Sequence, residues 1–323
     1  MTDAGCRVCG GKDGHRHFLV REMFFGSREP FDYFECGDCG TVQISDIPGD
    51  LARHYPDDYY SFAGSRARPA SRIEVALRRM RSDARLTGEG AIGRLLSRLS
   101  KRTPACVGWF AGIPVNTGSR IVDVGCGSGA LLLSMQRDGF RQLSGLDPFI
   151  AETIRYRSGL TIHRRSLAED AGSYDLIMMN HSFEHMPDPV AAMTHIADHL
   201  APGGRALVRL PIAGGHAWRT YRENWFQLDA PRHLVIPTVR AMHLLAEGAG
   251  MEVERCFFDS KADQFLASEA YRMDVPMAEH KHLPPRGEDE MNRLKSMAAR
   301  LNREGDGDQG GFVLRRKPGE SSS

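Results

Sequence analysis

The sequence lacks the features of a membrane-spanning, secreted or highly charged chain. Its longest stretch without a charged residue, residues 103–119, is shorter than a bilayer span and is interrupted by prolines and glycines. No basic start followed by an apolar run opens the chain, so we expect no signal peptide and a cytoplasmic protein. The 42 Lys and Arg nearly balance the 41 Asp and Glu, so no overall excess of charge favours nucleic acid or a membrane.

The composition that is present belongs to a folded protein. The 323 residues are 41% hydrophobic and 26% charged, which excludes a disordered chain, a collagen-like fibre and a disulfide-dense miniprotein. A chain of this length holds two domains, or one large domain with attachments. In a reducing compartment its seven cysteines indicate ligand or core chemistry rather than disulfides.

Four of the cysteines have the spacing of a metal site. They form two C-x-x-C pairs, Cys6 with Cys9 and Cys36 with Cys39. Two such pairs a few tens of residues apart are the ligand set of a four-thiolate zinc ribbon. A closed thiolate shell leaves no open coordination position, so the predicted Zn²⁺ is structural and takes no part in catalysis. The stretch between the pairs alternates enough to predict a small hairpin, and His15 or His17 could replace one cysteine as a ligand.

A basic segment follows the predicted ribbon. Residues 66–102 contain eleven Lys or Arg and three acidic residues, a net charge of +8, so that the rest of the chain carries −7. Apolar residues recur there at helical spacing, which predicts one amphipathic helix or two helices separated by residues 87–90. An aromatic cluster at residues 55–62 precedes this segment.

From residue 119 onward the pattern alternates between strands and helices, which predicts a doubly wound, mostly parallel sheet. The predicted strands are 120–124, 142–146, 160–164, 174–179, 205–210, 252–258 and a last strand at 311–316. Helices are expected up to about residue 138, near 149–157, after Asp188, near 238–247 and, with breaks, over 263–303. The last residues, 320–323, are expected to be disordered.

A glycine loop joins the first predicted strand to its helix. It reads Asp123-Val124-Gly125-Cys126-Gly127-Ser128-Gly129, and its glycines let the backbone approach a nucleotide closely. The same pattern satisfies the dinucleotide fingerprint, so the glycines alone do not identify the ligand. Asp123 would be a poor neighbour for a pyrophosphate, whereas it can engage an ammonium group. Asp147, at the tip of the second strand, is placed to accept hydrogen bonds from both hydroxyls of a ribose.

These motifs together resemble those of the class I S-adenosylmethionine (SAM)-dependent methyltransferases. The matching stretches are VDVGCGSG, the acid Asp147, YDLIMMN, and LAPGG before the fifth strand. The resemblance covers about residues 119–258 and the last strand. It implies an α/β fold with a seven-stranded Rossmann-like sheet, an antiparallel last strand, and SAM as cofactor. A Rossmann-like domain with another ligand, or with none, is the alternative.

The resemblance also implies a role for each matching residue. Asp123, Gly125, Cys126, Gly127 and Gly129 would hold the methionine end of SAM, Asp147 and Pro148 its ribose, Ser166 and Leu167 its adenine, and Asn180 and His181 would line the pocket near the sulfonium. The family often has an acidic residue where this chain has Ser166.

A candidate base lies shortly after the fourth predicted strand. Methyl transfer is an in-line displacement, so the enzyme mainly positions the acceptor and removes its proton. Glu184-His185, followed by Pro187 and Pro189, looks like the E-H motif of zinc-containing sugar methyltransferases. That resemblance implies His185 as the base, with Glu184 supporting it. Alternatively, His185 caps the next helix and only shapes the pocket.

The stretch after the fifth strand contains a second set of candidate site residues. Trp225, Arg232 and His233 lie in an insertion where this fold normally builds its acceptor pocket. Aromatic, cationic and histidine side chains together suit a sugar that carries an anionic nucleotide or phosphate, and His233 is a further catalytic candidate. A packed structural insertion is the alternative. Methyltransferases associated with surface polysaccharides resemble this chain over the insertion and over the tyrosine-rich segment at 55–62.

We therefore expect a SAM-dependent methyltransferase that acts on carbon or oxygen of a sugar or glycan precursor. The expected segments are a zinc ribbon at 1–45, an aromatic segment and basic helical linker at 46–116, a SAM-binding domain at 117–260, and a C-terminal helical segment with the last strand at 261–323. One alternative is an RNA methyltransferase that binds RNA through the ribbon and the basic helix. Another is a non-catalytic SAM-binding interaction protein. The basic helix could also touch an anionic membrane. The residues do not reveal the acceptor, the methylated atom or the oligomeric state.

Overall fold

The computed structural model describes residues 5–55, 71–99, 105–283 and 286–319. Within these ranges the chain forms two compact units. The N-terminal unit comprises residues 5–55, 183–193 and 209–312, and the glycine-loop unit comprises residues 71–182, 194–208 and 313–319. Most of the predicted aromatic cluster, the two ends of the basic segment and the expected disordered end lie outside the described residues. The division into four segments stays a prediction.

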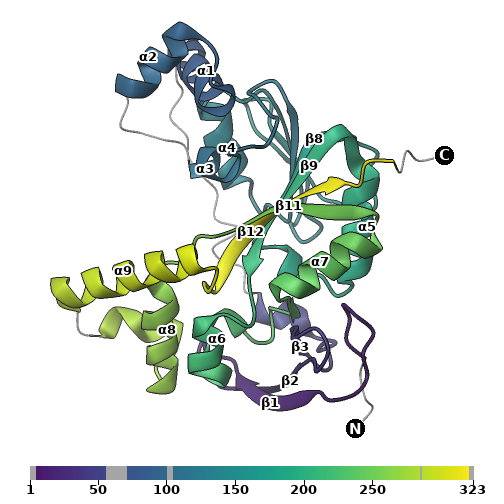
Figure 1. Ribbon diagram of the computed structural model, residues 1–323, viewed down its shortest axis with the longest axis vertical. Helices are drawn as coiled ribbons and strands as arrows, with labels where there is room; N and C mark the ends of the chain where they lie inside the picture. The colour runs from purple at the N-terminus through teal and green to yellow at the C-terminus, as the bar shows by residue number, and fades with distance from the viewer. Residues whose placement is uncertain (1–4, 56–70, 100–104, 284–285, 320–323) are drawn as a thin grey trace. The chain divides into compact units, whose positions relative to one another are not determined.

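The larger sheet has the order β11-β12-β9-β8-β4-β5-β7-β6, and Figure 1 labels its strands β8, β9, β11 and β12. Its strands are β4 (Arg120–Val124), β5 (Gln142–Leu146), β6 (Ile154–Arg155), β7 (Thr161–His163), β8 (Tyr174–Asn180), β9 (Leu200–Pro211), β11 (Met251–Phe258) and β12 (Gln309–Arg316). β4 pairs in parallel with β5 and with β8, and β5 pairs in parallel with β7. The predicted α/β fold with a mostly parallel sheet is confirmed.

The sheet differs from the expectation at one edge, because the described residues form eight strands in it rather than seven. The additional strand β6 pairs antiparallel with β7 and lies where a helix was expected near residues 149–157. That helix prediction was wrong. The β-branched pair Thr153-Ile154 favours an extended backbone. The Tyr156 hydroxyl also donates a hydrogen bond to the Ser128 carbonyl at 2.6 Å, which ties this segment to the glycine loop.

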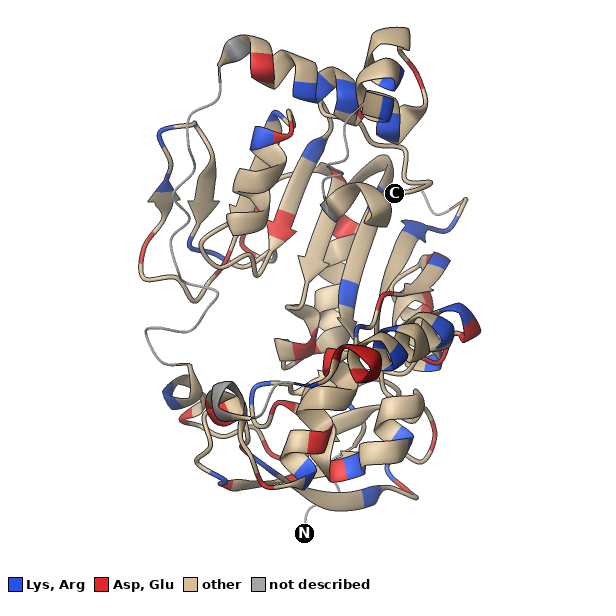
Figure 2. Ribbon diagram, turned by 90° about the vertical axis from the view of Figure 1, so that its left-hand side faces the viewer, with Lys and Arg blue, Asp and Glu red and all other residues tan. Residues whose placement is uncertain are grey.

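The basic segment forms two helices, α1 (Arg72–Thr87) and α2 (Ala91–Leu99). Ser71 caps α1 by accepting a hydrogen bond from the Glu74 amide, and Gly88 ends it in the left-handed region with φ 76°. Of the two arrangements that the sequence left open, the structure therefore has the one with two helices. Several Lys and Arg residues lie along these helices, coloured blue on the ribbon (Figure 2). Among the described residues before β5, two further helices are the short helix α3 (Ala105–Trp109) and helix α4 (Ala130–Arg137).

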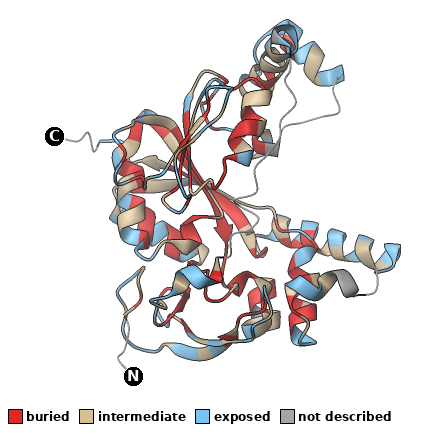
Figure 3. Ribbon diagram, turned by 180° about the vertical axis from the view of Figure 1, so that it is seen from behind, coloured by how far each residue is buried: buried red, intermediate tan, exposed pale blue. Residues whose placement is uncertain are grey.

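The central strands β4 and β8 of the glycine-loop unit are buried over most of their length (Figure 3). Val122 of β4 and Leu176 and Ile177 of β8 have no exposed surface. Strands buried on both faces are typical of a parallel sheet covered by helices. This core holds the carboxyl ends of β4, β5 and β8 in place, and the glycine loop and Asp147 follow directly from two of them.

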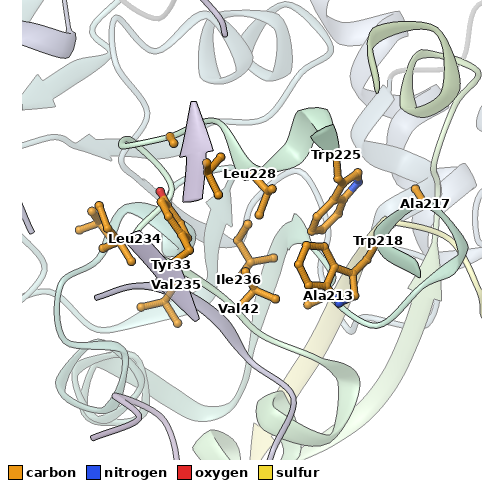
Figure 4. Packing of buried hydrophobic residues seen from close by; sticks show 13 residues of the cluster. Tyr33, Val42, Ala213, Ala217, Trp218, Trp225, Leu228, Leu234, Val235 and Ile236 are labelled. Carbon is orange, nitrogen blue, oxygen red and sulfur yellow. The ribbon is translucent and has the colours of Figure 1, made fainter. Parts of the chain in front are cut away.

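The N-terminal unit is built on a smaller antiparallel sheet of order β1-β2-β3-β10. Its strands are β1 (Arg16–Arg21), β2 (Pro30–Glu35), β3 (Val42–Ile44) and β10 (Val235–Ile236). The predicted hairpin is thus present, and β10 comes from the insertion after β9. Tyr33, Val42, Trp218, Trp225 and Ile236 share one buried core (Figure 4). The ribbon segment and the insertion therefore fold together.

The described helices of this unit all come after β3 in the sequence. They are α5 (Pro189–His199), which continues into the glycine-loop unit, α6 (His216–Tyr221), α7 (Val239–Gly248), α8 (Asp263–Arg272) and α9 (Glu288–Glu304). Short 3-10 turns include η1 (Leu51–His54), η3 (Phe183–His185) and η5 (Phe226–Leu228). Within the described ranges, none of the helices combines the length and apolar character needed to span a bilayer.

Candidate cofactor, metal and catalytic sites

The glycine loop after β4 has a backbone that only glycine adopts easily. Gly125, Gly127 and Gly129 have φ values of 73°, 53° and 77°. A Cβ atom on Gly125 would lie 2.4 Å from Cβ of Ser182, and one on Gly129 would lie 2.5 Å from Cδ1 of Ile162. Ser182 and Ile162 therefore pack directly against the loop backbone. Because its glycines have no side chains, the backbone can approach a nucleotide closely, as a nucleotide-binding loop requires.

Asp147 holds this loop in its conformation. The side chain is 5% exposed, and one carboxylate oxygen accepts a hydrogen bond from the Gly127 amide at 2.7 Å while the other accepts from the Phe149 amide at 2.9 Å. Pro148 lies in the turn between these contacts. Each carboxylate oxygen has a second lone pair, so Asp147 can still accept hydrogen bonds from a ligand.

Asp123 is a buried carboxylate at the end of β4, 3% exposed. Burial and the charge of Asp147 raise its pKa to about 8. Within the described ranges no basic side chain forms an ion pair with Asp123. SAM carries an ammonium group, which would supply the missing positive charge, so the residues present fit this cofactor. The neighbouring Cys126 thiol lies against Gly145, and burial raises its pKa, which keeps it neutral.

The other predicted cofactor residues lie in the same unit. Asn180 ends β8, and His181 follows in the left-handed region with φ 53°. The next residue, Ser182, donates a hydrogen bond to the Val124 carbonyl at 2.7 Å, which brings this turn against the glycine loop. Strained backbone of this kind is often found at functional sites. That Asn180 and His181 contact SAM stays a prediction.

The turn after β7 contains the predicted adenine-contacting pair. Leu167 is buried, and the amide and hydroxyl of Ser166 both donate hydrogen bonds of 2.8 Å to the Glu169 carboxylate. The resembled family often has an acid at the position of Ser166. Here Glu169 brings a carboxylate to that turn, and sequence reasoning overlooked it because it lies three residues further on.

The four predicted zinc ligands come together in the N-terminal unit, with all four sulfur atoms within 4.8 Å of one another. Two of the sulfur–sulfur distances, Cys6 to Cys39 and Cys9 to Cys36, are both 3.6 Å. Four thiolates about 2.3 Å from a tetrahedral zinc lie roughly 3.8 Å apart, so the cluster is consistent with structural zinc. Gln43 donates a hydrogen bond to Sγ of Cys6 at 3.1 Å, as outer partners of metal sites do.

Neither histidine near the ribbon belongs to this cluster. The His15 ring stacks on Phe34 with 4.5 Å between ring centroids, and its Nε2 lies 3.1 Å from the Gly11 carbonyl oxygen. The His17 ring lies 3.0 Å from the Asp32 carboxylate. The alternative in which a histidine replaces one cysteine is therefore not what the structure shows.

The three predicted catalytic residues also come together in the N-terminal unit. Glu184 and His185 form the turn η3, His233 precedes β10, and their ligand atoms all lie within 4.8 Å of one another. Nδ1 of His185 is 2.8 Å from the Arg232 carbonyl oxygen, and Nδ1 of His233 is 2.7 Å from the Gln227 carbonyl oxygen. A carbonyl oxygen only accepts, so each Nδ1 carries the hydrogen, and each neutral ring has its lone pair on Nε2.

Glu184 is fully buried beside this pair of rings, with one carboxylate oxygen 3.9 Å from Nε2 of His233. Burial lowers the pKa of His233, which favours its neutral form. The Tyr55 hydroxyl lies 3.0 Å from Nδ1 of His185. Sequence reasoning named Tyr55 only as part of an aromatic cluster, because nothing local connects it to a residue 130 positions away.

Arg232 and Trp225 do not have the role that the sequence suggested. Arg232 is fully buried, and its guanidinium forms two hydrogen bonds, of 3.0 and 2.6 Å, with Asp229 and one of 3.0 Å with Glu22. Trp225 is 1% exposed and donates its indole hydrogen to Asp308 at 3.0 Å. Two carboxylates thus take up the charge of Arg232, which leaves it unsuited to an anionic acceptor. The expectation of a phosphate-binding group here was wrong.

Comparison with known proteins identifies the domain. A family model described as a methyltransferase domain matches residues 85–255, just over half of the chain. Among curated relatives, a ubiquinone biosynthesis O-methyltransferase of Cupriavidus pinatubonensis is 32% identical over 116 residues, covering 32% of this chain and 46% of that protein. The enzyme of the same name from Xanthomonas axonopodis pv. citri is 37% identical over 111 residues, covering 30% of this chain and 46% of that protein.

This chain spans about half the length of the curated relatives that it matches. A solved mycolic acid cyclopropane synthase, in complex with SAH and CTAB, aligns with a TM-score of 0.42 and 16% identity over 75% of this chain and 94% of that one. That structural similarity is weak, and the family match and the motifs identify the domain. The chain belongs to the methyltransferase domain family, and its domain is of the SAM-dependent class that the glycine-loop motifs predicted.

Proposed function

We propose that this protein transfers a methyl group from SAM to oxygen or carbon of a small acceptor, a sugar or glycan precursor, with His185 as the base. The observation that carries the proposal is the ring orientation of His185. Its Nδ1–H is held by the Arg232 carbonyl, so the lone pair of the neutral ring is on Nε2. Asp123, Asp147 and the glycine loop would hold SAM, which supplies an electrophilic methyl group when bound.

Each residue of the His185 cluster would have a separate task. His185 would accept the acceptor proton at Nε2 and become an imidazolium, which the nearby buried carboxylate of Glu184 would stabilise. Burial lowers the pKa of His233, so its ring would be neutral. This ring would pack against the ring of His185, with 4.9 Å between the two ring centroids. Tyr55, whose hydroxyl lies 3.0 Å from His185, would help orient the imidazole.

The chemistry of the base bears on the class of acceptor. A base of this kind suits a hydroxyl group or an acidic C–H, both of which sugars provide. The E-H motif and the insertion after β9 support a sugar through their resemblance to sugar-associated methyltransferases. The curated relatives are named as O-methyltransferases, which supports transfer to oxygen. Because Asp229 and Glu22 neutralise Arg232, we do not expect this arginine to bind an anionic nucleotide portion of an acceptor.

The experiment is a screen of sugar and glycan-precursor acceptors with isotope-labelled SAM, followed by variants on the acceptor that reacts. His185→Ala should lower the transfer rate about 100-fold or more, because a positioned base contributes at least that factor, while the SAM dissociation constant changes less than about twofold. His243→Ala, at an exposed position on α7, is the matched control and should leave both quantities unchanged. Equal loss of binding and transfer in His185→Ala, or loss of neither, would remove His185 from the mechanism.

The same screen separates the alternative functions. SAM binding without transfer to any acceptor would favour a non-catalytic binding protein, and salt-dependent methylation of RNA would favour an RNA methyltransferase.

Metal analysis gives an independent check of His185. One zinc per chain is expected from the cysteine cluster. If a second metal is bound and is lost in His185→Ala, then Glu184, His185 and His233 bind a metal ion. In that case His185 is a metal ligand and not the general base.

A further inference from the structure

The α1–α2 pair is a firmly built part of the glycine-loop unit. The α1 residue Ser82 donates a hydrogen bond to the Asp138 carbonyl at 2.8 Å, and Asp83 accepts hydrogen bonds from the amide and hydroxyl of Thr117 at 2.8 and 2.9 Å. α2 packs on α1 through Gly93, where a Cβ atom would lie 2.2 Å from the Met80 carbonyl oxygen. The side of α2 that faces α1 is thereby fixed.

The opposite side of α2 carries large apolar side chains that nothing described covers. Ile92, Leu95 and Leu99, at positions i, i+3 and i+7, form a ridge on one helix face and are 59%, 58% and 75% exposed. Ile73 and Leu77, one turn apart on α1, are 75% and 43% exposed. These two helices therefore hold five of the eleven large apolar side chains that are exposed in the described part of the chain. Such a concentration marks an interaction surface.

Positive charge lies beside this ridge. Arg94 and Arg98, four residues apart on α2, are both exposed, and α2 contains no acidic residue. Residues 71–99 as a whole contain seven arginines and three acidic residues. A helix with a leucine and isoleucine ridge flanked by arginines has the arrangement of a helix that lies in the interface of an anionic membrane.

We infer that the α1–α2 pair docks on an anionic membrane surface. The ridge of Ile92, Leu95 and Leu99 enters the boundary between headgroups and acyl chains, and Arg94 and Arg98 contact lipid phosphates. This inference uses no residue of the proposed catalytic cluster, so it stands or fails separately from the proposed function.

Two other occupants fit the surface less well. Residues 71–99 contain no aromatic or histidine side chain on which an unpaired RNA base could stack, although such stacking is common in RNA-binding surfaces. A second copy of this chain, paired through the same ridge, would bring arginines against arginines, because α2 offers no acidic group in exchange. An anionic membrane surface can accept the apolar ridge and also bind the two arginines beside it.

The test is flotation of the full-length protein with vesicles. We expect binding to vesicles that contain phosphatidylglycerol, weaker binding in high salt, and little binding to pure phosphatidylcholine. Arg94→Glu with Arg98→Glu should lower the partition coefficient about 30-fold or more, since each basic residue near an anionic surface contributes about fivefold. Leu95→Asp with Leu99→Asp should lower it at least about tenfold, because the ridge no longer inserts.

Two substitutions at similar exposure elsewhere serve as controls. Leu19→Asp replaces a side chain that is 63% exposed on β1, and Arg303→Glu replaces an exposed arginine of α9. Both should bind vesicles as the unaltered protein does, and all variants should bind SAM normally, which shows that they are folded.

Three results would overturn the inference. The first is absence of binding to anionic vesicles. The second is unchanged binding by the Leu95→Asp, Leu99→Asp variant. The third is a protein that does not bind vesicles but instead forms a dimer that the Leu95→Asp, Leu99→Asp variant loses, or retains RNA in a way that the Arg94→Glu, Arg98→Glu variant loses. Sedimentation velocity detects the dimer.

Discussion

Both units contain buried carboxylates, but they differ in whether a basic side chain compensates the negative charge. In the N-terminal unit, Glu22 and Asp229 are paired with the buried guanidinium of Arg232, at 3.0 and 2.6 Å. In the glycine-loop unit, Asp123 and Asp147 are 3% and 5% exposed, and the pKa of Asp123 is raised to about 8 by burial and by the charge of Asp147. Among the described residues, no basic side chain forms an ion pair with Asp123.

This difference distinguishes a structural cluster from a site prepared for a ligand. A buried carboxylate that already has its cation contributes to the fold and has little left to offer a ligand. A buried carboxylate without a cation destabilises the ligand-free protein, and a cationic ligand such as SAM relieves that cost on binding. Arg232, which the sequence suggested as a binding residue, therefore has a structural role.

Replacing Arg232 should have the largest effect on stability. Arg232→Met leaves Glu22 and Asp229 buried without their cation, which should lower the free energy of unfolding by about 3–5 kcal/mol, as measured by urea denaturation. SAM binding by the protein that remains folded should be unchanged. A loss below about 1 kcal/mol would show that Arg232 is not the structural partner of these two carboxylates, and would reopen its assignment to an acceptor.

Replacing Asp123 should have the opposite effect on the ligand-free protein. The raised pKa means that the folded state keeps its proton between about pH 4 and pH 8 while the unfolded state has lost it. The stabilisation that comes from the protonated carboxyl is therefore complete below about pH 4 and is lost as the pH rises towards 8. The slope is at most about 1.4 kcal/mol per pH unit.

Asp123→Asn removes this titration, so the difference in unfolding free energy between Asp123→Asn and the unaltered protein should grow in favour of the variant from pH 5 to pH 8. Denaturation curves at both pH values, without SAM, measure it. Parallel pH profiles for the two proteins would show that Asp123 does not carry a buried, uncompensated charge.

The smallest effect is expected for an exposed ion pair in the N-terminal unit. Arg219 and Asp306 lie 2.7 Å apart with side chains 54% and 29% exposed. Arg219→Ala should cost no more than about 1 kcal/mol of unfolding free energy, because water screens exposed pairs. A loss as large as that of Arg232→Met would mean that burial is not what separates the two arginines.

The sequence predicted best where local pattern decides the structure. The bounds of β4 and β5 agree with the prediction. For β4 the reason is its buried β-branched run, Ile121, Val122 and Val124, which leaves few alternatives to a strand. The four cysteines were found for a similar reason, since C-x-x-C spacing brings two thiolates to one ion. The helix expected near 149–157 failed because contacts from the glycine loop, such as Tyr156 to Ser128, outweighed a weak helical pattern.

The remaining differences depend on contacts between residues far apart in the chain. Glu22 reaches Arg232 across 210 positions and Tyr55 reaches His185 across 130. No spacing rule connects such residues, so the sequence presented Arg232 as an available cation. The eighth strand, β6, was overlooked because two residues give too short a pattern to recognise.

The most direct test is to measure SAM affinity and methyl transfer together in the unaltered protein, Asp123→Asn and His185→Ala, by calorimetry and labelled SAM. Asp123→Asn should raise the SAM dissociation constant about tenfold or more, because a charged hydrogen-bonding partner is lost. His185→Ala should bind SAM within about twofold of normal and lose transfer about 100-fold. If Asp123→Asn binds SAM normally, or if His185→Ala transfers methyl groups at the normal rate, the division of labour proposed for the two units is contradicted.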